Sequence, residues 1–508
     1  MKLNISDSKK CVRFDQTLLP IIIEWVFTFG VWYISCKKIT FKDDVSHCMG
    51  KIRDELYNRL SEKPHPLFVF KNSIIPAATI WVGVRAWVKV FRELQLEAGD
   101  RIILSYEESP AFVHVVFASI WEGLTLIILK PATISDQSLA FFDAKLIISS
   151  EKNPYSIQPD NMGLPQEKVK LRETFFGKSL ESRFILQTSG STGNSKFVCL
   201  AEDAIHNVIQ THSKIFKSNK TSVLSILPWT HCFGLVLDLL MCTLHSDMII
   251  RDPENGKKVE LLVDIISKYE INHFSSVPLV VERILKNENG IELLQKLQSG
   301  IIGGAPISKQ VAEKLRTTKL CVGYGQTEAS PGICLGEKGI FFENYIGYPL
   351  GCETRINKNG ELQFKGNNAL VGYWQAGVID IIPQDEWIST GDIVQQKTEG
   401  LFFVGRLNFS FKLPNGIMIQ PEIIEKELLN KIKSISMCMV FFNKQMHLLF
   451  SVENQILEEE IIEIIRNNLP PFLKNADFKF AIVSKEKWIY SPKGEINRNA
   501  MIERFLNI

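Results

Sequence analysis

The chain has 508 residues, of which 45% are apolar and 22% charged, and its formal net charge is +2. This is the balance of an ordinary globular protein, and the length favours two or more domains. No basic or acidic block is present, so nucleic acid is excluded as an expected partner. The ten cysteines form no C-x-x-C pair and no zinc-type spacing, so free thiols in a reducing, cytoplasmic setting are expected.

The first apolar stretch, residues 18–36, is about long enough to cross a bilayer. Pro20 and Glu24 lie inside it, and no small-residue cleavage site follows. We therefore expect a buried helix and strand of an N-terminal domain, with no stable membrane insertion. Shallow membrane contact is the alternative.

From residue 77 onward, short apolar runs alternate with helical patterns, which predicts an α/β architecture with largely parallel sheets. The expected helices are 77–96, 112–121 and 235–244, and the expected strands are 101–105, 124–129, 223–227 and 248–250.

After Asn344 the pattern changes to glycine-punctuated short strands at 360–364, 372–374 and 400–404. These predict a small β-rich subdomain. The last hundred residues resemble a compact α+β unit with a helix at 422–432. We expect an N-terminal domain at 1–404 made of two stacked α/β subdomains and the β-rich one, a hinge at 405–408, and a mobile C-terminal domain at 409–508.

A glycine-rich loop follows the apolar run 184–186 and carries the strongest local signal. It reads Thr188, Ser189, Gly190, Ser191, Thr192, Gly193, Asn194, Ser195 and Lys196. Glycines let backbone N–H groups turn toward an anion, hydroxyls donate further bonds, and the lysine adds positive charge. A triphosphate needs these groups, although the spacing is not that of a Walker A loop.

Further motifs follow in order along the chain, and each alone has a plain structural reading. His231, within P-W-T-H-C-F-G, could be a core histidine, and the T-G-D that contains Asp392 could be a turn. The segment P-E-I-I-E, which begins at Pro421, could be the start of a helix with acidic residues at its positive end. The remaining motifs are Gly303-Gly304-Ala305-Pro306, Gly323-Tyr324-Gly325-Gln326-Thr327-Glu328 and Gly405-Arg406.

Taken together and in this order, the motifs resemble the adenylate-forming family of acyl-CoA synthetases, luciferases and peptide-synthetase adenylation domains. The resemblance covers about residues 77–498. It implies ATP and Mg²⁺ as cofactors, with Thr188 through Gly193 and Lys196 on the phosphates. It places His231 beside the substrate carboxylate, and Gly304, Ala305 and Pro306 along the acyl pocket and adenine. It implies that Tyr324, next to Gly325, stacks on adenine and that Thr327 bonds the α-phosphate. It also implies that Glu328 holds Mg²⁺ and that Asp392 and Arg406 lie at the ribose.

The chain departs from the family pattern near its end. The motif usually written P-x-x-G-K-I-x-R reads Pro492-Lys493-Gly494-Glu495-Ile496-Asn497-Arg498, so Glu495 stands where the adenylating lysine is expected. Losing such a charge-neutralising group costs about 100- to 1000-fold in rate. Lys493 could substitute, because residues i and i+2 of an extended segment share a face. The hinge carries Asn408 in place of Asp or Lys, and Lys412 matches the lysine that follows it.

The resemblance implies a two-step reaction. A carboxylate attacks the α-phosphate of ATP to give an acyl-AMP and pyrophosphate, and a thiol of CoA or of a carrier protein's phosphopantetheine then attacks the acyl-AMP and takes the acyl group. No aspartate follows His231 at the position that pairs an amino group, so a fatty, short acyl or aryl acid without an α-amino group is expected. Glu495 leaves two alternatives open: an enzyme that consumes preformed acyl-AMP, and a nucleotide-binding pseudoenzyme.

Overall fold

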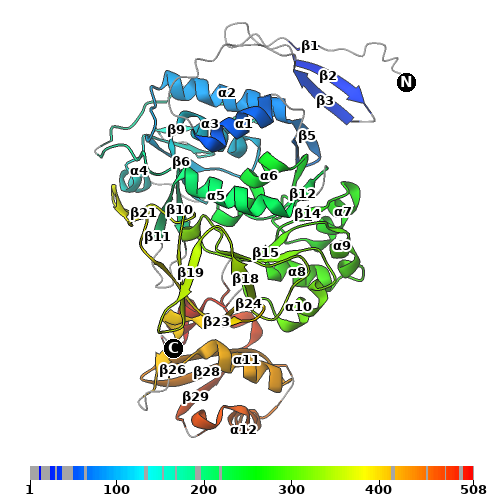
Figure 1. Ribbon diagram of the computed structural model, residues 1–508, viewed down its shortest axis with the longest axis vertical. Helices are drawn as coiled ribbons and strands as arrows, with labels where there is room; N and C mark the ends of the chain where they lie inside the picture. Colours follow the sequence, from blue (N-terminus) through cyan, green and yellow to red (C-terminus); the bar gives the residue numbers. More distant parts are fainter. Residues whose placement is uncertain are drawn as a thin grey trace.

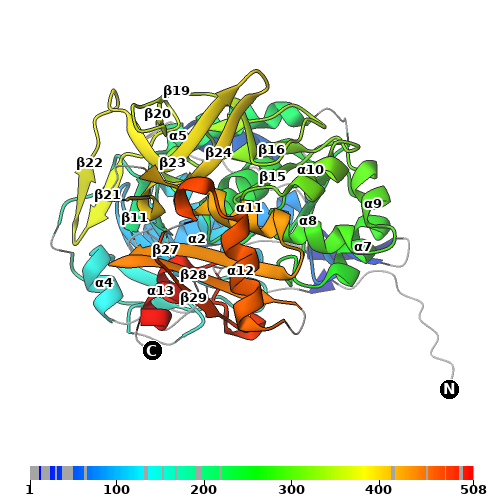
Figure 2. The ribbon, with the colours of Figure 1, turned by 90° about the horizontal axis from the view of Figure 1, so that it is seen from below.

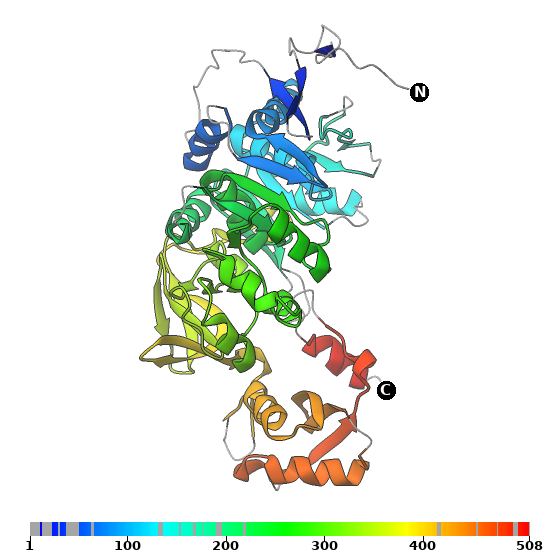
Figure 3. The ribbon, with the colours of Figure 1, turned by 90° about the vertical axis from the view of Figure 1, so that its right-hand side faces the viewer.

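The computed structural model describes the backbone of residues 11–12, 23–28 and 31–36, and residues 50–61, 66–130, 136–151, 154–165, 169–174, 176–188, 196–216, 220–413, 418–453, 456–474, 476–490 and 496–506. Figure 1 shows a large lobe, which runs from the N-terminus to the yellow strands, and a small orange and red lobe at its lower end. Figure 3 shows the same two lobes from the side. The expected α/β class with a small α+β C-terminal part is confirmed.

The first sheet is assembled around buried parallel strands. Its order is β22 (Val378–Ile381), β21 (Gly372–Gln375), β11 (Lys196–Leu200), β10 (Phe184–Thr188), β7 (Thr125–Ile128), β6 (Arg101–Ser105), β8 (Leu146–Ser149) and β9 (Ser156–Ile157). Strands β10, β7, β6, β8 and β9 are parallel, and β11, β21 and β22 add antiparallel at one edge. Every residue of β6 and β7 is buried, as expected of a parallel sheet covered on both faces.

The second sheet lies beside the first and is also mainly parallel. Its order is β14 (His273–Phe274), β12 (Ser222–Ser225), β13 (Met248–Arg251), β4 (Leu67–Phe70) and β5 (Ser73–Pro76). The helices of the two α/β parts are α1 (Lys51–Ser61), α2 (Ala77–Glu93), α3 (Pro110–Glu122), α4 (Asp136–Phe142), α5 (Glu202–His212), α6 (Met241–His245), α7 (Val259–Lys268), α8 (Pro278–Leu285) and α9 (Gly290–Lys296), with a 3₁₀ turn η1 (Ser213–Ile215). The helix expected at 235–244 is formed by η2 (Gly234–Leu240), which is a π-helix, followed by α6.

The third sheet joins two parallel strands to an antiparallel layer. Its order is β15 (Ile301–Gly303), β16 (Cys321–Tyr324), β17 (Cys334–Leu335), β18 (Tyr345–Pro349), β24 (Gly400–Arg406), β23 (Ile388–Lys397), β20 (Glu361–Lys365) and β19 (Glu353–Ile356), with α10 (Lys309–Leu315) and the 3₁₀ turn η3 (Thr327–Ala329) between strands. The placement of 372–374 in this β-rich part is wrong. That segment is β21, which pairs with β11 of the first sheet.

The small lobe has its own hydrophobic core, which centres on Leu428, Leu448, Phe450 and Ile465. Its elements are η4 (Leu407–Phe409), β25 (Phe411–Lys412), β26 (Met418–Ile419), α11 (Pro421–Lys431), β27 (Ile435–Asn443), β28 (Gln445–Val452), α12 (Glu458–Asn468), η5 (Pro471–Leu473), β29 (Phe478–Ile482), η6 (Lys485–Lys487) and α13 (Arg498–Leu506). Figure 2, a view from below, shows this lobe lying across the end of the large lobe.

The N-terminal apolar stretch contains β2 (Ile23–Thr28) and β3 (Val31–Cys36), which pair antiparallel, and β1 (Cys11–Val12) pairs with β2. The helix expected within 18–36 is therefore wrong for 23–28 and 31–36. Both segments are rich in β-branched and aromatic residues, which favour strands. Within the described part of the chain, no helix has the length and apolar character needed to span a membrane.

Candidate active site

The glycine-rich loop connects two antiparallel strands of the first sheet. Thr188 ends β10 and lies opposite Lys196, the first residue of β11. The Thr188 hydroxyl donates to the Lys196 carbonyl at 3.4 Å. The loop residues Ser189, Gly190, Ser191, Thr192 and Gly193 lie outside the described residues. The structure thus fixes the two ends of the loop and presents Lys196, which is exposed, at its exit.

Three side chains from distant parts of the sequence meet beside this exit. The Lys196 ammonium lies 5.2 Å from the ring centroid of Tyr373, and the Tyr373 hydroxyl donates to Glu328 Oε1 at 3.4 Å. Burial, and then the Glu328 carboxylate, raises the pKa of Tyr373, so this phenol is a neutral donor at physiological pH. Lys196 and Glu328 were predicted from motifs, whereas nothing in the sequence pattern distinguishes Tyr373 from an ordinary strand tyrosine.

The G-G-A-P and Y-G-Q-T-E segments follow two neighbouring parallel strands. Ile301 pairs with Cys321 in β15 and β16, so both segments leave the sheet at the same edge, where α/β proteins commonly bind ligands. Gly304 and Pro306 are exposed there, and Ala305, Gly325, Thr327 and Glu328 are half-buried. A side chain at Gly325 would place its Cβ 1.6 Å from the Pro331 carbonyl oxygen, so only glycine fits this position.

The T-G-D aspartate lies in a second polar cluster on the adjoining strands. Asp392 is directly opposite Arg406 in the β23–β24 pairing, and their side chains form an ion pair of 2.9 Å. The Tyr324 hydroxyl donates to Asp392 Oδ2 at 2.7 Å. Burial, and then the Asp392 charge, raises the pKa of Tyr324 well above its usual value. Asp392 is only 3% exposed, and its backbone N–H donates to the Thr390 hydroxyl at 3.1 Å, which fixes the turn.

His231 lies half-buried just before η2. The next residue, Cys232, is buried, and burial together with the Glu328 charge raises the pKa of its thiol, which places this segment close to Glu328. The Cys232 thiol therefore feels the charge of Glu328, and His231 is the residue just before it in the chain.

A buried charge cluster supports the chain just before His231. Arg251 pairs with Glu108 and donates to the Leu227 carbonyl at 3.1 Å, and Glu108 Oε1 accepts from the Trp229 N–H at 2.6 Å. Asp238 Oδ2 accepts from the Leu227 N–H at 3.1 Å and lies 4.0 Å from Arg251. Sequence pattern did not reveal this cluster, because its members come from separate elements.

The residues present fit a magnesium–nucleotide. Among the residues that the structure describes, no three His, Cys, Asp or Glu side chains gather as a metal cage. Mg²⁺ is commonly held by one or two carboxylates together with substrate phosphates, and the half-buried Glu328 beside Lys196 offers that donor set. The Tyr373 bond to Glu328 is the kind of outer contact that orients a metal-binding carboxylate.

Polar contacts join the predicted hinge motif to α11, and join α11 to α13 within the small lobe. The Arg406 N–H donates to Glu422 Oε1 at 3.4 Å, and Arg498 makes a two-pronged pair with Glu425 at 2.7 and 2.8 Å. Lys412 is exposed on β25, and Asn408 lies in η4. Residues 491–495, with Lys493 and Glu495, lie outside the described residues, between Tyr490 and Ile496, which form a bridge.

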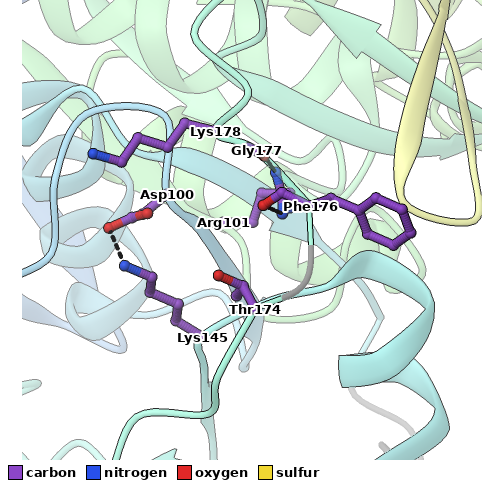
Figure 4. A pocket seen from close by; sticks show the side chains of 7 residues that line it. All are labelled: Asp100, Arg101, Lys145, Thr174, Phe176, Gly177 and Lys178. Atoms are coloured by element: carbon purple, nitrogen blue, oxygen red, sulfur yellow. Dashed lines mark hydrogen bonds and ion pairs between the residues drawn. The ribbon is translucent and has the colours of Figure 1, made fainter.

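A surface pocket lies elsewhere on the first sheet. It is lined by Asp100, Arg101, Lys145, Thr174, Phe176, Gly177 and Lys178. Figure 4 shows Lys145 reaching Asp100, at 2.7 Å, while Phe176 points toward the β21–β22 hairpin. Arg101 is engaged by Asp143 at 2.7 Å. The charged side chains of this pocket are thus paired with neighbouring residues, so they stabilise the fold and are not assigned to a ligand.

Comparison with known proteins identifies several relatives. A probable 4-coumarate–CoA ligase 1 of Dictyostelium discoideum is 28% identical over 281 residues, which cover 51% of this chain and 50% of that protein. A long-chain-fatty-acid–CoA ligase of Yersinia pestis is 26% identical over 48% of this chain and 47% of that protein. A probable CoA ligase of Humulus lupulus is 26% identical over 71% of this chain and 76% of that protein. The chain spans about half the length of the first two relatives.

Solved structures share the fold over most of the chain. O-succinylbenzoate coenzyme A synthetase of Bacillus subtilis, in complex with ATP and magnesium ion, superposes with a TM-score of 0.72 at 18% identity, covering 88% of this chain and 98% of that one. ATP-bound MatB of Rhodopseudomonas palustris gives a TM-score of 0.73 at 18% identity over 90% and 99%. Residues 83–374, more than half of the chain, match the profile of the AMP-binding enzyme family. The chain belongs to the AMP-binding enzyme family.

Proposed function

We propose that this chain is an ATP-dependent acid–thiol ligase. One observation carries the proposal: the stretch from Tyr324 to Glu328 joins the two polar clusters. Its first residue bonds Asp392 and its last bonds Tyr373 next to Lys196. The four residue-to-residue steps from Tyr324 to Glu328 span at most about 14 Å, so a single nucleotide can extend from a ribose site at Asp392 to a phosphate site at Lys196 and Glu328.

The first step joins two anions, the substrate carboxylate and the α-phosphate, so charge neutralisation and positioning dominate the barrier. When bound at Glu328, Mg²⁺ would neutralise phosphate charge. Lys196 adds a positive charge at the loop exit, and Thr327 offers a hydroxyl to the α-phosphate. Asp392 accepts from the ribose hydroxyls, and the bond to Asp392 holds the Tyr324 ring for stacking on adenine.

The proposed acid lacks an α-amino group. Asp238, the next acidic residue after His231, is fully buried and already accepts from Ser225 and Leu227. It therefore offers no exposed charge to a substrate amine. The neighbouring η2 is apolar apart from Asp238 and wholly buried. A fatty, short acyl or aryl acid suits this surrounding.

In the second step a thiol attacks the acyl carbon of the acyl-AMP and AMP leaves, and the small lobe presents a different face to the site by rotation at 405–408. The relatives named as CoA ligases favour CoA over a carrier-protein phosphopantetheine. Lys412 lies on the small lobe just beyond the hinge and would change its distance from the site with this rotation. Closure of the lobe also excludes water from a hydrolysable intermediate.

Glu495 supports a second candidate, an adenylation-impaired enzyme that consumes preformed acyl-AMP. A carboxylate in place of the adenylating lysine adds repulsion toward phosphates instead of neutralising them. Lys493 is the residue that would restore the positive charge in the first candidate.

The test is pyrophosphate release with hydroxylamine as acceptor, over a panel of fatty, aryl and small acids. Activity of the native chain that is lost in Lys493→Ala supports the ligase with Lys493 in the lysine role. A silent native chain beside an active Glu495→Lys variant supports the impaired enzyme. If neither turns over and ATP still raises the melting temperature, the nucleotide-binding pseudoenzyme is favoured.

A further inference from the structure

The segment that carries Tyr373 is fastened to both halves of the proposed phosphate site. The Leu370 N–H donates to the Glu328 carbonyl at 2.8 Å, and the Val371 N–H donates to the Cys199 carbonyl of β11 at 2.9 Å. Residues 370–371 thus tie the η3 turn, which bears Glu328, to the strand that begins with Lys196. A shift of either element relative to the other would break these bonds.

Strand register then determines where the Tyr373 ring lies. Tyr373 is directly opposite Val198, and Lys196 lies two residues before Val198 on the same strand, so the Lys196 and Tyr373 side chains share one face of the sheet. The next residue, Trp374, points to the opposite face, where it stacks with Phe142 at a centroid distance of 6.4 Å. The aromatic packing behind the sheet holds β21 in place while Tyr373 faces the site.

We propose that Tyr373 is a positioning residue that aligns Glu328 and Lys196 for magnesium–ATP, which deepens the proposed function and rests on it. The hydroxyl orients the Glu328 carboxylate, which would hold the metal. The ring supports the Lys196 ammonium by a cation–π contact and keeps it above the strand. One tyrosine therefore couples the metal ligand to the phosphate-binding lysine, although the two lie 132 residues apart.

Two substitutions separate these contributions. Tyr373→Phe removes only the hydroxyl and keeps the ring under Lys196, whereas Tyr373→Leu removes both. Tyr348→Phe is the matched control, because Tyr348 is 41% exposed and its hydroxyl donates to a backbone carbonyl, that of Thr398, at 3.3 Å. Thermal melting of each variant without nucleotide establishes that it is folded.

The readout is the Kd of ATP measured by calorimetry, once with excess Mg²⁺ and once with a chelator. Outer contacts of metal ligands are worth about 10- to 100-fold in metal affinity, so we expect Tyr373→Phe to weaken binding with Mg²⁺ about 10-fold. The Kd of ATP for Tyr373→Phe in the presence of the chelator should stay within about twofold of the native value. Tyr373→Leu should in addition weaken binding with chelator by about two- to fivefold, since the cation–π support of Lys196 is lost. Tyr348→Phe should match the native chain in both conditions.

A double-mutant cycle locates the effect. In a Glu328→Gln background the added Tyr373→Phe change should have little further effect with Mg²⁺, because the carboxylate it orients is gone. Native-like binding by Tyr373→Phe, or equal weakening with and without Mg²⁺, would overturn the inference while leaving the proposed function standing. A native chain that binds no ATP in either condition would overturn both.

Discussion

Asp238 provides a prediction whose size and direction follow from its burial. Burial, opposed by Arg251 and by the bonds from Ser225 and Leu227, raises its pKa from the ordinary value of 3.8 to about 7. An acid whose pKa is higher in the folded state stabilises the fold below its unfolded pKa and loses that contribution as pH rises to the folded value. Between pH 4 and 7 the contribution of Asp238 to the stability of the native chain should therefore fall, by at most about 4 kcal/mol.

The substitution Asp238→Asn removes this titration and keeps the size of the side chain. Its amide oxygen can still accept from Ser225 and Leu227, so the bonds to the chain before His231 are retained. We expect the melting temperature of the variant, relative to native, to rise by several degrees between pH 4.5 and pH 7 and to level off above pH 7.5. Asp385→Asn, at an exposed position, is the control and should follow the native chain at every pH. Parallel pH curves for native and Asp238→Asn would refute the reasoning from burial.

Three further changes have definite expected outcomes. Tyr324→Phe removes the hydroxyl that donates to the Asp392 carboxylate. Because hydrogen bonds to charged groups contribute about 1.5–3 kcal/mol, ATP affinity measured by calorimetry should fall about 10- to 150-fold. Native-like affinity would contradict the assignment of Asp392 to the ribose site. Arg498→Ala leaves Glu425 buried without its partner, which should destabilise the small lobe by about 3–5 kcal/mol and speed its proteolysis, and resistance equal to native would argue against this role. Gly325→Ala would force Cβ against the Pro331 carbonyl oxygen and should abolish ATP binding, whereas Gly177→Ala, where the added Cβ meets no atom within 4 Å, should leave it intact.

The sequence predicted those elements whose pattern is local. Strand 101–105 coincides with β6, and helix 112–121 lies within α3, because a continuous apolar run and a helical period are visible without tertiary information. The segment 372–374 was placed in the wrong sheet. The sequence of a short strand does not indicate which strand it pairs with. The sheet to which 372–374 belongs is determined by its long-range pairing with β11.

The candidate site divides in the same way. Lys196, His231, Glu328, Asp392 and Arg406 stand in recognisable motifs, and their assigned roles remain predictions. Tyr373 and the Glu108–Arg251–Asp238 cluster were not predicted. The Tyr373–Glu328 contact joins residues 45 positions apart, and the Glu108–Arg251 contact joins residues 143 positions apart.

The predicted hinge is a third case. Asn408 lies within the 3₁₀ turn η4 and is not among the described residues with positive φ. Asparagine tolerates left-handed backbone better than most residues, but the structure does not use that tolerance at this position.

The most direct test of acid activation is exchange of labelled pyrophosphate into ATP, measured with and without each carboxylic acid. Only reversible formation of an acyl-AMP makes this exchange depend on the acid. We predict acid-dependent exchange by the native chain and its loss in Asp392→Ala. Tight ATP binding without exchange for any acid in the panel would contradict the proposed acid activation.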